Sequence, residues 1–180
     1  ILFSDRSISD PFHLESFHNL SVAAFRTGVS LKGTNTVING NQSKYYFPAF
    51  IIIEDKHNVS LESFIFTGFS FPIIYCKNNS DVLISYCDFT NNHVDNKIAI
   101  LIFENSISIS FISTNFSILT SHDASILSSS FSNIKFDRCS FDKAFLFHAS
   151  KDIPLIMSIK SNFKIFNSIR TNMFSKYHIK

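Results

Sequence analysis

The stretch HNVSLESFIFTG, residues 57–68, reads as a half-buried β-strand bounded by turn residues. Its apolar residues are separated by small or polar residues, which favours a strand with one buried face. These apolar residues are Val59, Leu61, Phe64 and Phe66. A similar stretch, HNLSVAAFRTG, occurs at residues 18–28. The repetition predicts a unit in which His-Asn forms a turn and Thr-Gly ends a strand.

A six-residue pattern that ends in Phe recurs along the chain and reads apolar, any, any, small or variable, any, Phe. Its copies are LESFIF at 61, ISYCDF at 84, FISTNF at 111, FDRCSF at 136 and, less cleanly, IRTNMF at 169. Short apolar runs stand at residues 50, 72, 98, 124 and 154, and each is followed by a polar stretch with Asn. One repeat is therefore predicted to contain a strand, an Asn-bearing turn, a second strand and a variable loop.

Such repeats predict a solenoid, because a single unit cannot bury its own apolar face and stacked units can. We predict an all-β fold, a right-handed parallel β-helix of about six to seven coils. Residues 1–180 are expected to form a single domain that belongs to a longer chain, with residues 1–17 as an N-terminal cap or partial coil. A short helix is the alternative near the start, where Asp10 suits an N-cap and Pro11 the first helical position.

Stacking in register predicts columns of like residues, because successive coils lie about 4.8 Å apart. Inward phenylalanines would form one column. Turn asparagines would form another, because Asn tolerates left-handed conformations and stacked amides hydrogen-bond from coil to coil. The predicted columns are Phe66, Phe89, Phe116 and Phe141, and Asn58, Asn79, Asn105 and Asn133.

The stretch VSLKGTNTVINGNQ, residues 29–42, resembles the opening coils of pectin-lyase-like right-handed parallel β-helices. In those proteins an apolar strand, a Gly and a strand ending in Ile-(Asp or Asn)-Gly-Asn recur. PAFIIIEDKHNVSLESFIFTG at 48–68 is similar to the coil that follows. Later coils resemble degenerate polymorphic-outer-membrane-protein repeats, because FTNN keeps their Phe-x-x-Asn motif at Phe89 and Asn92. The resemblance implies a parallel β-helix over residues 18–176.

Composition and charge exclude several classes of function. Hydrophobic residues make up 45% of the chain, so it is not a disordered protein. Sixteen basic and fourteen acidic residues give a net charge of +2, and we expect no nucleic-acid partner. The chain has no run of about eighteen apolar residues, so no membrane insertion is expected within these bounds. The three cysteines, Cys76, Cys87 and Cys139, lack metal-site spacing, and we expect buried free thiols, no metal and no cofactor.

The motifs of sugar hydrolysis found in polygalacturonase-type relatives are missing. Those enzymes use Asn-Thr-Asp, Asp-Asp, Gly-His-Gly and Arg-Ile-Lys, and none of these stands in the chain. The outward positions of the hexads supply candidate binding residues instead. Glu62 and Asp88, on neighbouring coils, are the best carboxylate pair, and Tyr86 and Arg138 share the column beside them. No residue is assigned a catalytic role.

Five sequons favour a secreted protein, and two of them, Asn58 and Asn78, lie near predicted turns that would accommodate a glycan. The five sequons are Asn19, Asn41, Asn58, Asn78 and Asn115.

The sequence therefore predicts a non-catalytic segment of a surface-exposed or secreted β-helix, extracellular or at the cell surface. Stacked coils hold out a rigid face, and we expect that face to serve adhesion through contacts with glycans or with host or cell-surface proteins. The segment is expected to be a monomeric part of a larger protein. The alternatives are a fragment of a carbohydrate-active enzyme, a polysaccharide hydrolase or lyase, and a spacer within a larger surface protein.

Overall fold

A computed structural model describes most of the chain as stacked β-strands. The described residues are 2–3, 29–40, 49–54, 57–78, 80–94, 99–122, 125–147, 156–171 and 174–175, and they contain no helix. The first strands are β1 (Leu2–Phe3), β2 (Val29–Asn39), β3 (Ile51–Glu54), β4 (His57–Thr67), β5 (Ile74–Lys77), β6 (Ser80–Ser85), β7 (Asp88–Val94) and β8 (Leu101–Glu104). The later strands are β9 (Ile109–Ile112), β10 (Asn115–His122), β11 (Leu127–Ser130), β12 (Asn133–Asp137), β13 (Ser140–Phe147), β14 (Ile156–Ile159), β15 (Asn162–Phe166), β16 (Ile169–Thr171) and β17 (Phe174–Ser175).

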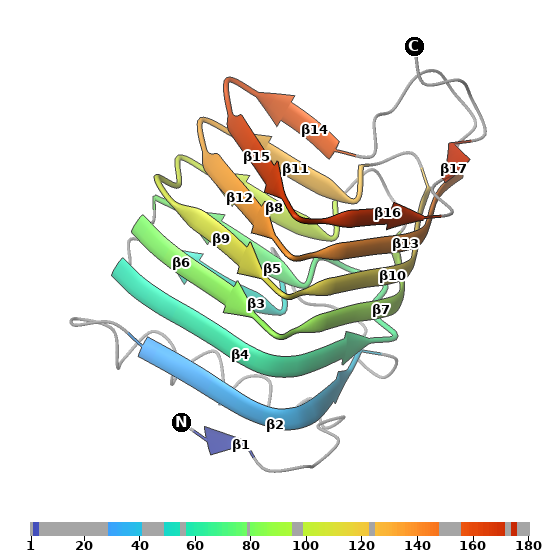
Figure 1. The fold of residues 1–180 in the computed structure, drawn as a ribbon, viewed down its shortest axis with the longest axis horizontal. Helices are drawn as coiled ribbons and strands as arrows, with labels where there is room; N and C mark the ends of the chain where they lie inside the picture. The colour runs from blue at the N-terminus through green and yellow to red at the C-terminus, as the bar shows by residue number, and fades with distance from the viewer. Residues whose placement is uncertain are drawn as a thin grey trace.

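These strands form two sheets of parallel strands (Figure 1). The smaller sheet has the order β14-β11-β8-β5-β3, and the larger sheet follows the path β15-β12-β9-β6-β4-β7-β10-β13-β16. Each coil contributes one strand to the smaller sheet and two to the larger one. The next coil then stacks beside it, one strand spacing further along the solenoid. The described part is therefore a parallel β-solenoid of about four turns.

The larger sheet bends at a corner that separates two branches. One branch contains β6, β9, β12 and β15, and the other contains β7, β10, β13 and β16. The corner explains the spacing of apolar residues within each hexad. In each hexad the third residue has a positive φ, as in Ser63 (61°), Tyr86 (53°) and Ser113 (48°). The first, fourth and sixth residues point inward, so Leu61, Phe64 and Phe66 are all buried. A hexad is thus the end of one strand, one corner residue and the start of the next strand, which breaks the two-residue period once.

The predicted phenylalanine column is present in the core. Phe66, Phe89, Phe116 and Phe141 are register partners from coil to coil. Their rings are stacked, with centroid separations of 5.0 Å, 5.3 Å and 4.9 Å along the column. Burying one such side chain contributes about 1.5 to 3 kcal/mol.

A second aromatic column meets the first one edge to face. Phe111 and Phe136 stack at 4.9 Å, and Phe111 contacts Phe116 at 5.5 Å in a T-shaped arrangement. Edge-to-face ring pairs add about 0.5 to 1.5 kcal/mol each beyond the area that they bury. The aromatic core therefore ties the two branches of the larger sheet together at the corner.

The predicted single column of asparagines is wrong. Asn105 aligns with Asn78 of the preceding coil, at the turn that follows the smaller sheet. The residue of the following coil that aligns with Asn105 is Phe131, so the asparagine column stops there. Asn58 aligns with Asp81, and Asn133 aligns with Asn162. The stretch between the two sheets differs in length from coil to coil, so asparagines at similar sequence positions occupy different columns. Asn79 lies outside the described residues.

Three further expectations need correction or lie beyond the description. The fifth hexad is IFNSIR at 165–170 rather than IRTNMF at 169, because Asp137 pairs with Phe166 and Phe141 pairs with Arg170. The described residues account for about four turns, fewer than the six to seven coils expected. The candidate helix that starts at Asp10, and most of the cap at 1–17, fall outside the described residues.

Candidate functional site

The corner carries an outward row of residues, which we name the corner ridge. One residue from each coil contributes, and all have a left-handed backbone with φ between 45° and 61°. Tyr86 is 58% exposed, and Arg138 is also exposed. The corner ridge comprises Asn35, Ser63, Tyr86, Ser113, Arg138 and Asn167.

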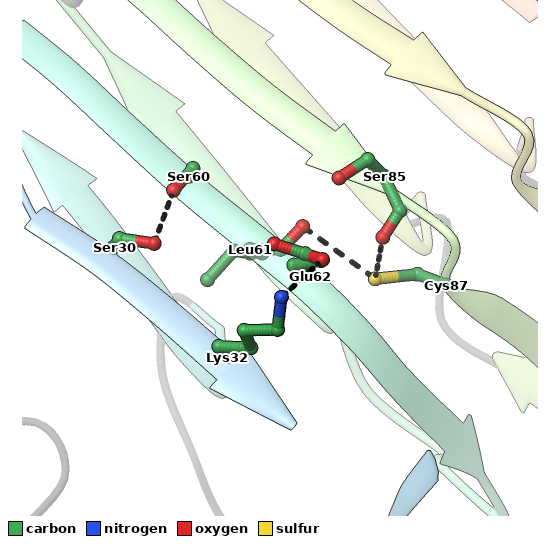
Figure 2. Close-up of polar contacts among 7 residues, drawn as sticks. All are labelled: Ser30, Lys32, Ser60, Leu61, Glu62, Ser85 and Cys87. Atoms are coloured by element: carbon green, nitrogen blue, oxygen red, sulfur yellow. Dashed lines mark hydrogen bonds and ion pairs between the residues drawn. The ribbon is translucent and has the colours of Figure 1, made fainter. Parts of the chain in front are cut away.

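The residue after each corner position points inward, and in several coils its side chain hydrogen-bonds to main-chain carbonyl oxygens at the bend. The Cys87 thiol donates to the carbonyl oxygens of Ser85, at 3.3 Å, and of Leu61 on the preceding coil, at 3.7 Å (Figure 2). Thr114 Oγ1 makes the same pair of contacts one coil further along, at 3.1 Å and 3.3 Å. These contacts add a side-chain donor to main-chain carbonyls on two successive coils at the bend, which ties the backbone under the ridge to the preceding coil.

The Cys139 thiol repeats this arrangement, 3.5 Å from the carbonyl oxygens of both Asp137 and Phe111. Burial raises the pKa of the Cys87 thiol to about 12 and raises the pKa of Cys76 and Cys139 as well. All three cysteines are free and buried, as the sequence predicts. A thiol with such a pKa remains protonated at neutral pH, which makes it a poor nucleophile.

On one side of the ridge, Glu62 lies in a polar row on the outward face of β2 and β4. Its carboxylate is 2.8 Å from the Lys32 ammonium, and Ser60 Oγ donates to Ser30 Oγ at 2.8 Å (Figure 2). The lysine and glutamate side chains are 49% and 31% exposed, so their ion pair contributes little stability. Its effect is to hold the Glu62 carboxylate toward β2.

Asp88 lies on the other side of the ridge, in the row that also holds Asn115 and Ser140. Burial raises the pKa of the Asp88 carboxyl, against a hydrogen bond from the Asn115 side chain that lowers it. Ser140 Oγ in turn donates to Asn115 Oδ1. The register thus sets Glu62 and Asp88 on opposite sides of the corner, each within its own row of polar side chains.

The outward face of the smaller sheet holds a contact that sequence reasoning missed. The Tyr75 hydroxyl donates to Glu104 Oε2 at 2.8 Å. Burial, this hydrogen bond and the charges of Glu104 and Glu54 raise the pKa of Tyr75 to about 12. The alternation in IIYCK marks Tyr75 as outward, but only the register between β5 and β8 brings Glu104 within reach.

The sequons differ in their surroundings. Asn58 and Asn78 are exposed, with φ values of 52° and 53°, so both lie at the surface. Asn115 is half-buried and hydrogen-bonded within the row of Asp88. Asn19 and Asn41 lie outside the described residues.

The described residues give no sign of two other kinds of site. Among them, no group of three or more His, Cys, Asp or Glu side chains is placed to hold a metal ion. A search of the same residues found no helix of the length and apolarity that a membrane crossing requires.

Comparisons with known proteins add a distant likeness in fold. No known protein family and no curated protein matches the sequence. Among solved structures, the chain resembles a "putative glycosyl hydrolase" from Parabacteroides merdae, with 12% sequence identity and a TM-score of 0.44. The match covers 82% of this chain and 72% of that chain. A likeness at this level assigns neither a family nor an activity.

Proposed function

We propose that the chain is a non-catalytic recognition segment of a surface-exposed or secreted β-solenoid. It contacts a glycan or a protein through the corner ridge, with Tyr86 and Arg138 as the main contact residues. The observation that carries this proposal is the placement of two large, exposed side chains on one ridge, two coils apart. A rigid row of this kind presents its side chains at a fixed spacing of about 9.6 Å, twice the strand separation.

The backbone conformation of the ridge supports this role. A left-handed residue favours Gly, Asn or Asp and costs other side chains about 1 to 2 kcal/mol. Asn35 and Asn167 suit the conformation, whereas Tyr86 and Arg138 do not. The preference of the backbone therefore does not account for a tyrosine and an arginine here, and contact with a ligand is the role that we propose for them. Tyr and Arg are also the residues that most often dominate binding energy at interfaces.

The arrangement of carboxylates supports a non-catalytic role. Glycosidases hold two carboxyl groups about 5 to 9.5 Å apart across one scissile bond. Here Glu62 is paired with Lys32 on one side of the ridge, and Asp88 is bonded to Asn115 on the other. Each carboxylate is directed into its own row, so the two do not converge on a shared bond.

A binding experiment tests the proposal. The chain is applied to an array of neutral, carboxylated and sulfated oligosaccharides and to intact cells, before and after protease treatment of the cells. Tyr86→Ser and Arg138→Ser are the test variants, because Ser63 and Ser113 show that the ridge accepts serine. Ile118→Asn is the matched control, since Ile118 is an exposed left-handed residue outside the ridge. We expect the two ridge variants to lose binding about tenfold and the control to retain it.

Unchanged binding in both ridge variants contradicts the ridge as the contact surface. Absence of binding to every glycan and to cells favours the spacer reading instead.

One observation favours an enzyme as the second candidate. The raised pKa of Asp88 is a property that general acids share. Release of reducing ends from neutral and acidic polysaccharides, abolished by Asp88→Asn or Glu62→Gln, would establish the hydrolase and overturn the non-catalytic proposal.

A further inference from the structure

Positive charge gathers on the outward face of β12 and β15, which we name the basic face. Lys135 and Lys164 are register partners on these adjacent strands, and Lys160 stands at the turn before β15. Arg138 of the corner ridge borders the face at the end of β12. Among the outward residues of these two strands, Asp137 is the single carboxylate, and Lys135 pairs with it at 3.7 Å. Four cations against one acid contrast with the near-neutral chain as a whole.

Two exposed phenylalanines hold the lysines in place at the ends of the face. The Lys135 ammonium lies 5.4 Å from the centre of the Phe166 ring, and the Lys160 ammonium lies 5.4 Å from that of Phe131. Phe131 is 55% exposed and Phe166 is 46% exposed. A cation over an aromatic face is attracted to it, so the rings restrict where the two ammonium groups lie. The charges are therefore partly ordered before any ligand arrives.

Amide groups lie between the charged positions. Asn162 Nδ2 donates to Asn133 Oδ1 at 2.8 Å, and Asn133 Nδ2 donates to the carbonyl oxygen of Ile107 at 2.9 Å. These bonds fix the two side chains side by side on the exposed surface. Fixed amides beside cations suit a ligand that carries both hydroxyl groups and anions.

We infer that the basic face binds a sulfated polysaccharide. This inference rests on the proposed recognition function and names the ligand class for a second contact surface beside the ridge. Sulfate esters would lie against the lysines, and sugar hydroxyls would meet the asparagine amides. Three of the four cations are lysines, whose ammonium groups act as point charges. Such point charges bind tetrahedral anions without a fixed orientation, which suits sulfate esters spaced along a polysaccharide.

The same features disfavour a nucleic acid on this face. Duplex DNA carries one negative charge per about 1.7 Å and needs a long basic track, whereas this face spans two strands. Proteins that hold single strands stack bases on exposed aromatic rings. Here both rings already have a lysine ammonium over them.

The test measures affinity for dextran sulfate and for unsulfated dextran of the same length. The test variant is Lys135→Gln with Lys164→Gln, and the control variant is Lys32→Gln with Lys77→Gln, which removes the same charge elsewhere. We expect dextran sulfate to bind and dextran not to bind. The test variant should lose affinity about tenfold and show a smaller salt dependence, and the control should change less than about twofold. Lys135→Arg with Lys164→Arg should retain binding.

Several outcomes would overturn the inference. Equal loss in the two Gln variants would mean a general charge effect. Binding of polygalacturonate, a DNA duplex or anionic lipid vesicles as strong as that of dextran sulfate would remove the assigned ligand class. Loss of dextran sulfate binding in Tyr86→Ser but not in the lysine variant would place the ligand on the ridge. That result would contradict the basic face as a binding surface and leave the proposed recognition function intact. Absence of binding to all glycans and to cells would contradict both the recognition function and the basic face.

Discussion

Asn92 and Phe69, which lie 23 residues apart in the chain, are joined by a buried hydrogen bond. The main-chain amide of Phe69 donates to Asn92 Oδ1 at 3.0 Å, and Asn92 Nδ2 donates to the carbonyl oxygen of Phe66 at 3.0 Å. Asn92 is fully buried and belongs to the Phe-x-x-Asn stretch that begins at Phe89. Its side-chain amide therefore ties this coil to the preceding one at the point where the preceding coil leaves the sheet.

Asn92→Leu should destabilise the fold by about 3 kcal/mol, because it removes two buried hydrogen bonds, one of them to the main-chain amide of Phe69. Denaturant unfolding followed by circular dichroism measures this change. Asn91→Gly is the matched control, since Asn91 is exposed with a φ of 54° and Gly68 takes the same place one coil earlier. An Asn92→Leu protein as stable as the parent would show that the two bonds do not matter.

Phe89→Ala should cost about 3 to 5 kcal/mol, because Phe89 is the second ring of the buried column and contacts rings on both sides. Thermal unfolding provides the measurement. Phe131→Ala removes an equally large but exposed ring and should leave the melting temperature nearly unchanged. Similar losses in the two variants would contradict the assigned core.

Cys87 and Thr114, the inward hydrogen-bond donors that follow the corner, should differ in the substitutions that they tolerate. Cys87→Thr should be nearly neutral, because Thr114 occupies the same column and makes the same two contacts. Cys87→Val removes the thiol donor and keeps a small apolar side chain, so it tests the two thiol contacts alone. Thr114→Val should cost about 1 kcal/mol, because it removes a hydroxyl donor, which is stronger than a thiol, from the carbonyl oxygens of Ile84 and Ile112. Unfolding free energies of the three variants give the order, and equal stability of Thr114→Val and the parent would contradict it.

Alkaline titration tests the Tyr75–Glu104 contact. The folded chain raises the pKa of Tyr75 from 10.0 to about 12, so the neutral phenol is the form that the fold favours. The stability from this group is complete below pH 10 and declines as the pH rises toward 12. Unfolding free energy measured across this range should fall less steeply in Tyr75→Phe. Identical slopes for the variant and the parent would show that Tyr75 titrates normally.

Relief of backbone strain provides a fifth prediction. Ile118 is a β-branched residue with a φ of 51° and is 43% exposed, so its conformation is unfavourable and its side chain buries little. Ile118→Asn should therefore stabilise the fold by about 1 kcal/mol. A higher denaturation midpoint is the expected result. A lower one would mean that the isoleucine packs more than its exposure suggests.

The stacked core follows from the sequence because it depends on a short-range pattern. The spacing of apolar residues in each hexad sets which side chains face inward, and Phe66 and Phe89 then fall in register at the ends of two hexads. The corner at Tyr86 is harder to predict, because a serine, a tyrosine and an arginine share that conformation and no residue type marks it.

Contacts between coils depend on the register of their strands, and loops of varying length set that register. The Tyr75–Glu104 bond joins residues 29 apart, and the lysines of the basic face meet only once Lys135 and Lys164 are aligned. A shift of one residue would move either lysine to the core face. For the same reason the predicted asparagine column failed, although Asn58, Asn105 and Asn133 do lie at or next to strand ends.

The parallel pairing of both sheets gives the solenoid unequal resistance to pulling. Their hydrogen bonds run from coil to coil, so tension applied along the stacking axis loads a single rung at a time and peels the strands apart in sequence. Tension applied across the axis shears many rungs together. As a tether, this chain would therefore yield at low force when drawn lengthwise and hold at a much higher force when drawn sideways.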